Sequence, residues 1–108
     1  MLEIDSACNI KLTRGDTGAF QIDLIGSDDL PYIPQEGDSL RFAMAKQYAG
    51  DVIIEKDIPI DTLLLKLEPE DTKSLDFGSY VYDIQFTSAD GDVSTIILSK
   101  LTITKEVA

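Results

Sequence analysis

The feature that most constrains this chain is an alternating segment of ten residues, 78–87, that is followed closely by Asp90-Gly91. Four apolar side chains of this segment fall on one face of an extended strand, namely Tyr80, Tyr82, Ile84 and Phe86. A period of two residues fits a strand and not a helix. The Asp-Gly pair favours the positive φ angles of a tight hairpin turn. The segment therefore predicts a β-hairpin whose first strand is half-buried.

Shorter segments elsewhere in the chain alternate in the same way and are bounded by Gly, Pro and acidic residues. They cover residues 10–13, 20–24, 40–45, 52–56 and 63–67. A helix is the competing interpretation for residues 42–48, but a segment bounded by Gly37 and Gly50 is short enough to favour a strand. Pro59 is expected to end the fourth of these segments because proline cannot donate to a central ladder.

In the return segment of the hairpin, from Val93 to Ile103, the apolar residues switch from odd to even positions and back, so they do not all fall on one face of a regular strand. Ile97 and Leu101 share one face of a strand, whereas Ile96 and Leu98 share the other. A bulge or a break near Ser99-Lys100 would reconcile the two patterns.

One helical turn is predicted near residues 69–75. Pro69 suits the first position of a helix, and the acids Glu70 and Asp71 suit its first turn. Leu75 can then fold back on the core. This turn would link two strands across one end of the domain.

About seven strands with no helical period between them predict an all-β fold, a two-sheet immunoglobulin-like β-sandwich. A small barrel is the alternative. The chain of 108 residues has the usual size of one domain, and residues 1–108 are expected to form a single one.

The charge of the chain limits its partners. Twenty acids against nine Lys and Arg give a net charge of -11, which repels phosphate backbones and anionic lipids. No nucleic-acid or membrane partner is therefore expected. The N-terminus lacks the basic and apolar regions of a signal peptide, and no segment approaches the ~20 apolar residues of a membrane span.

The composition argues against catalysis. The chain has no His, no Trp and one Cys, so the common acid/base, metal-ligand and nucleophile sets are reduced to carboxylates and hydroxyls. Without a His to activate it, Cys8 is expected to be a small hydrophobe near the first strand. We expect no enzyme activity, no catalytic residue and no cofactor.

Residues 26–37 form a long connection that is rich in Gly, Pro and acids, and long loops often carry binding sites. The candidate interaction residues in it are Asp28, Asp29, Tyr32 and Glu36. Tyr32 could serve as an exposed anchor, because its ring can pack while its hydroxyl bonds. Its alternative role is to cap one end of the sandwich.

Two further motifs have simple explanations. The loop acids lack the regular spacing of a calcium loop, so they are expected to be solvated turn formers and no metal site is assigned. They are Asp28, Asp29, Glu36, Asp38, Asp90 and Asp92. The tripeptide 14–16, Arg-Gly-Asp, occurs in adhesion loops, but glycine and aspartate at a turn between strands explain it better.

Three stretches carry a resemblance to a known family. They are residues 12–17 leading into the strand at Phe20, residues 37–42, and the long block from residue 67 to residue 93. They resemble small β domains encoded among the tail genes of phages and prophages of Gram-positive bacteria, akin to the N-terminal domain of baseplate upper proteins.

The resemblance implies a non-enzymatic structural and assembly domain of a phage tail or baseplate. Other tail or baseplate proteins, and a second copy of the chain, are then the expected partners, and the expected location is a virion assembled in the bacterial cytoplasm. Exposed edge strands at residues 2–10 and 101–107 could pair with neighbours. The alternative is a carbohydrate- or ligand-binding β-sandwich module, aided by calcium, that uses Tyr32 and the acidic loops.

Overall fold

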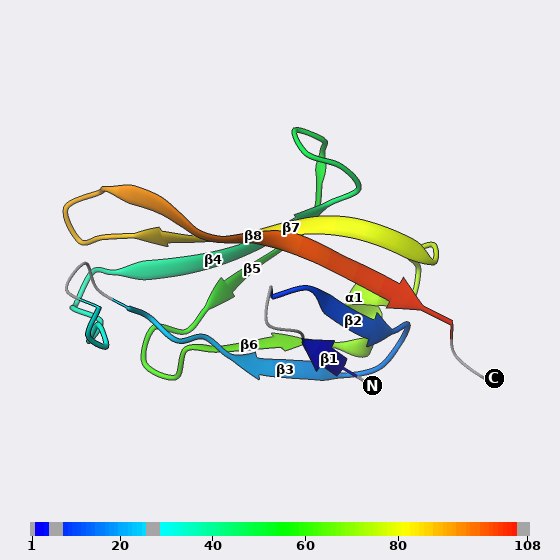
Figure 1. Cartoon of the computed structure of the whole chain (residues 1–108), viewed down its shortest axis with the longest axis horizontal. Coiled ribbons are helices and arrows are strands. Elements are labelled where there is room, and N and C mark those ends of the chain that lie inside the picture. Colours follow the sequence, from blue (N-terminus) through cyan, green and yellow to red (C-terminus); the bar gives the residue numbers. More distant parts are fainter. Residues whose placement is uncertain (1, 5–7, 26–28, 106–108) are drawn as a thin grey trace.

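The computed structural model of the chain describes residues 2–4, 8–25 and 29–105. These residues form a large and a small β-sheet, joined at one end by a single short helix (Figure 1). The prediction of an all-β, two-sheet sandwich with one short helical turn is confirmed. The elements in chain order are β1 (Leu2–Ile4), β2 (Ile10–Thr13), β3 (Gly18–Gln21), β4 (Ser39–Ala45), β5 (Val52–Ile58), β6 (Leu64–Leu67), α1 (Pro69–Thr72), β7 (Gly78–Thr87) and β8 (Val93–Thr104).

The large sheet has the strand order β1-β2-β8-β7-β4-β5, and the small sheet pairs β3 with β6. Neighbouring strands run antiparallel except for β2 and β8, which run parallel. The segment 101–104, expected to be an exposed edge, instead lies inside the large sheet between β2 and β7. That expectation was wrong because alternation alone does not reveal a strand's neighbours. β1 and β5 are the edges of the large sheet.

The core lies between the two sheets and consists of the inward side chains that the alternation predicts. Its fully buried members include Leu12, Leu40, Phe42, Leu65, Leu67, Ile84 and Leu101. Burying each such side chain stabilises the fold by roughly 1.5–3 kcal/mol. Phe42 at the centre of β4 has no exposed surface, which settles the choice between strand and helix at this segment.

The hairpin between β7 and β8 forms where the sequence predicts it, with a different turn. The amide of Ser88 donates to the carbonyl of Asp92, and the amide of Gly91 donates to the carbonyl of Ser88. Of the five residues between β7 and β8, Ser88 and Asp92 extend the pairing, so the three residues 89–91 form the turn, in which Gly91 takes a φ of 93°. This is the pattern of a turn followed by a G1 bulge.

A β-bulge at Ile96 shifts the register of β8 and so changes which residues face the core. It lies earlier than the expected position near Ser99-Lys100. Ile84 pairs with Ile97 and Gln85 pairs with Thr95, so Ile96 is the extra residue. The parity rule could not locate this bulge because Ile96 is apolar although its side chain is exposed.

The helix α1 begins at Pro69, as predicted, and is held by Asp71. The Oδ2 atom of Asp71 accepts a hydrogen bond of 2.6 Å from the amide of Glu68 and lies 2.6 Å from the Nζ atom of Lys56 on β5. One side chain thus caps the helix and ties it to the edge of the large sheet. No described helix is long and apolar enough to cross a membrane.

Candidate functional site

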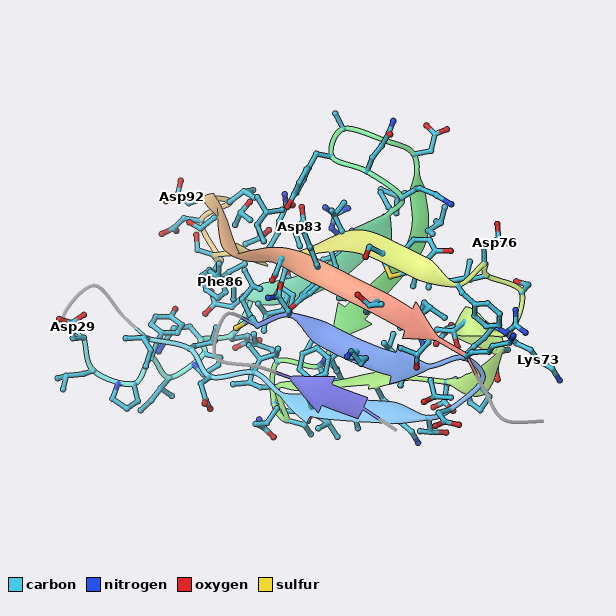
Figure 2. The ribbon with its side chains drawn as sticks, turned by 45° about the vertical axis from the view of Figure 1, so that its right-hand side comes forward. Asp29, Lys73, Asp76, Asp83, Phe86 and Asp92 are labelled. Atoms are coloured by element: carbon cyan, nitrogen blue, oxygen red, sulfur yellow. The ribbon has the colours of Figure 1, made fainter. Side chains whose placement is uncertain are left out.

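The candidate site lies on the outer face of the large sheet, which is the face turned away from β3 and β6. In the middle of this face, Asp83 of β7 is paired with Ala43 of β4 on one side and with Leu98 of β8 on the other. Because alternate residues of a strand point to opposite faces, all three side chains stand on the outer face. Figure 2 shows Asp83 standing out from this side of the sheet.

The connection between β4 and β5, residues 46–51, rises from the sheet on the same side (Figure 1). Its conformation is set by a hydrogen bond of 3.0 Å from the amide of Gly50 to the carbonyl of Gln47, and by a positive φ of 61° at Ala49. A Cβ atom on Gly50 would lie 2.9 Å from the carbonyl oxygen of Gln47, closer than real side chains approach. Glycine at this position therefore permits the tight loop.

Beneath this loop lies a half-open hollow of about 220 Å³, called here the outer hollow. Its lining comprises Ala43, Met44, Ala45, Gln47, Tyr48, Ala49, Gly50, Val52, Val81, Tyr82, Asp83 and Leu98. Two small side chains, Ala43 and Ala45, stand where larger ones would fill the space. The walls are mostly apolar, and among the described residues that line the hollow Asp83 is the only one with a carboxylate, ammonium or guanidinium group.

The Oδ1 atom of Asp83 is buried and accepts no hydrogen bond. No other buried side-chain oxygen or nitrogen of the described residues is left without a partner. The nearby cation Arg41 bonds instead to Glu55 at 3.3 Å and to Gln85 at 3.0 Å. A buried polar atom without a partner costs about 1–3 kcal/mol, more when it is charged. The outer hollow thus offers an acceptor that the protein itself leaves unused.

The structure places the candidate interaction residues of the 26–37 loop in different surroundings. Asp29 and Glu36 are exposed, with Asp29 at the outer end of the molecule (Figure 2), and Asp28 lies outside the described residues. The ring of Tyr32 packs edge-on against Phe86 with 5.5 Å between centroids. Its contacts are those of the capping role that the sequence left open.

Asp38, which was expected to be a solvated loop acid, is instead buried and organises this end of the sandwich. It is only 8% exposed and accepts bonds from the amide of Gln35 at 2.7 Å, the hydroxyl of Tyr32 at 2.8 Å and the amide of Ala89 at 2.9 Å. The signal that could have identified it is the glycine before it. Gly37 has a φ of +93°, and a Cβ there would lie 3.0 Å from the Cβ of Ala89.

These hydrogen bonds shift the pKa values of Asp38 and Tyr32 in opposite directions. The amide of Gln35 lowers the pKa of Asp38 most, with the Tyr32 hydroxyl and the Ala89 amide adding to it and desolvation opposing it. The pKa of Tyr32 is raised, chiefly because its hydroxyl donates to the Asp38 carboxylate. Asp38 is therefore a structural carboxylate, both of whose oxygens already accept hydrogen bonds.

A second hollow of about 330 Å³ lies beside this end of the sandwich. It is lined by Leu24, Ile25, Tyr32, Phe86, Ser94 and Ile96. It is the larger of the two, but its lining offers no charged group to orient a ligand. The outer hollow is the better candidate because it combines apolar walls with one unpaired acceptor.

The Arg-Gly-Asp tripeptide is held against the domain and is not displayed at a loop tip. The guanidinium of Arg14 lies 4.1 Å from the centroid of the Phe77 ring, and the amide of Gly15 donates to the hydroxyl of Thr72 at 2.9 Å. Gly15 takes a φ of 81°, as expected of a turn. These contacts agree with the turn interpretation of the motif.

Acidic side chains do not gather around a cation site in the part of the chain that the structure describes, where no three of His, Cys, Asp or Glu lie close enough to hold a metal ion. Cys8 is partly buried, and its carbonyl accepts a hydrogen bond from the hydroxyl of Tyr82.

Neither a family model nor a curated protein matches the chain. The fold is similar to the crystal structure of CopC from Methylosinus trichosporium OB3b, with 19% sequence identity and a TM-score of 0.42, over 68% of this chain and 72% of the other. The expected role in a phage tail or baseplate is therefore withdrawn, since no family model or curated protein of that kind matches the chain and the solved structure named here is CopC. At this identity and TM-score the similarity carries no conclusion about what this chain binds, which depends on its own residues.

Proposed function

We propose that the protein is a non-catalytic recognition domain that binds a positively charged group in the outer hollow. The observation that carries the proposal is the buried Oδ1 atom of Asp83, which lies in a half-open hollow and accepts no hydrogen bond. A cationic donor entering the hollow would supply the missing bond. Charge-assisted hydrogen bonds are the stronger kind, and they gain strength where water is excluded.

The charge of the whole chain supports a cationic ligand. At -11 the domain attracts cations from a distance and repels anions, which raises the rate of encounter with a positively charged partner. The size of the hollow supports a small group. Pockets that enclose drug-sized ligands measure roughly 300–1,000 Å³, whereas the outer hollow measures about 220 Å³.

The proposal is tested by NMR titration of the ¹⁵N-labelled protein with three probes of one size, which are n-butylammonium, n-butanol and butyrate. We expect n-butylammonium to bind with a Kd on the order of millimolar, the range of weak, small ligands, and to shift the amides of residues 43–52 and 81–83. Butanol and butyrate should not saturate the site.

Two matched variants locate the effect. Asp83→Asn should weaken n-butylammonium binding by about tenfold or more, since a hydrogen bond to a charged group contributes about 1.5–3 kcal/mol. Asp57→Asn makes the same change of charge at an exposed position of the same sheet face and should change the Kd less than about twofold. Equal binding of all three probes, or equal loss in both variants, would contradict the proposal.

A further inference from the structure

The rim of the outer hollow carries more apolar surface than a small cation needs. Three large apolar side chains at the hollow are widely exposed, namely Tyr48 at 58%, Val52 at 52% and Leu98 at 60%. They come from three different segments, the 46–51 loop, β5 and β8. Exposed apolar side chains that gather around a polar floor are typical of an interaction site.

From this arrangement, and resting on the proposed function, we infer that the occupant is a lysine side chain presented by an extended segment of a partner polypeptide. The lysine stem has an apolar length that suits the apolar walls, and its ammonium can donate to the buried Oδ1 atom of Asp83. The residues that flank the lysine in the partner would cover Tyr48, Val52 and Leu98.

The geometry favours lysine over arginine. A guanidinium is a planar fork that bonds best to two oxygens at once, whereas an ammonium is a compact point charge. The outer hollow leaves one buried oxygen without a partner, and the neighbouring carboxylate of Glu55 is already bonded to Arg41 at 3.3 Å. A compact ammonium can reach the buried Oδ1 atom within a hollow of about 220 Å³ more easily than a broad planar guanidinium.

The half-open shape favours a polypeptide over a free amine. A hollow that does not enclose its ligand leaves part of that ligand outside, and the exposed apolar rim gives this outer part a surface to contact. A free alkylamine would fill the hollow and leave the rim uncovered. The rim therefore adds affinity only when the ammonium is attached to apolar neighbours.

The experiment compares peptides of one length by NMR titration and calorimetry. The probe is acetyl-Val-Lys-Val-amide, and its comparators replace the lysine by arginine, Nε-acetyllysine or norleucine; n-butylammonium is titrated in parallel. We expect the lysine peptide to bind at least about tenfold more tightly than n-butylammonium and to shift the resonances of Tyr48, Val52 and Leu98. Asp83→Asn should remove most of this affinity and Asp57→Asn little of it.

Each contrary result has its own meaning. If n-butylammonium binds as tightly as the lysine peptide and depends on Asp83, the inference of a polypeptide partner is wrong while the proposed function stands. If the arginine, acetyllysine or norleucine peptide binds as tightly as the lysine peptide, lysine is not the recognised group. If neither the lysine peptide nor n-butylammonium shows saturable binding that depends on Asp83, the inference and the proposed function both fail.

Discussion

Asp83 and Asp38 are both aspartates with buried oxygen atoms, but they differ in whether these oxygens accept hydrogen bonds. Asp38 accepts three hydrogen bonds and joins the loop before β4 to the β7–β8 hairpin, whereas one oxygen of Asp83 is buried and accepts none. The first arrangement stabilises the folded state, and the second reduces its stability. Binding sites often retain such unfavourable groups because they are needed for the ligand.

Replacing Asp83 by valine should therefore stabilise the protein in the absence of ligand. Asp83→Val removes a buried acceptor without a partner and places a β-branched side chain in a strand, so we expect the free energy of unfolding to rise by about 1–2 kcal/mol. Urea denaturation measures this change, with Asp57→Val as the exposed control. A loss of stability in Asp83→Val would show that Asp83 has a structural role.

Asp38 should make stability depend on pH in the acid range. Its pKa is lowered in the folded state from 3.8, so its contribution is complete above that value and is lost as the pH falls through the lowered pKa. In urea denaturation between pH 2 and 7, Asp38→Asn should be less stable than the wild type at neutral pH, and the difference should shrink toward low pH. A difference that is constant with pH would exclude this role.

At the scale of elements, the helix α1 depends on one side chain more than on its length. Four residues make too short a helix to be stable alone. Asp71 accepts the amide of Glu68 and pairs with Lys56, whose side chain reaches the helix from β5. The helix is thus part of the connection between the two sheets.

Asp71→Ala should destabilise the domain by about 1–2 kcal/mol, the usual cost of a lost cap, with the partly buried ion pair adding to it. Glu70→Ala removes an acid from the neighbouring, exposed position of the same turn and should change stability by less than about 0.5 kcal/mol. Thermal unfolding measures both variants. Equal effects would mean that the general charge of the turn matters and the specific contacts of Asp71 do not.

At the scale of the whole molecule, the sequence predicts the two-sheet architecture and its core residues better than the order in which the strands pair. Alternation identifies which side chains enter the core, so Phe42 and Ile84 are placed correctly from the sequence. The strand order depends on contacts between distant segments, and local patterns do not encode these contacts. The parallel pairing of β2 with β8 was therefore missed.

The candidate site was missed for a related reason. Asp83 occupies an outward position of β7, and in the sequence it looks like any solvated acid on a strand. Only the fold places the 46–51 loop above it and small side chains beside it. The loop acids Asp29 and Glu36 were the more visible candidates, yet the structure leaves them in solvent.

The parallel pairing of β2 with β8 bears on how the chain is made in the cell. Thr13 lies beside Thr104, which follows it by 91 residues, so β2 has no place in the large sheet until β8 has left the ribosome. Contacts between such distant segments slow folding. This side of the sandwich can therefore close only after β8 has been synthesised, and until then the nascent β2 lacks its parallel neighbour and is exposed to wrong pairing.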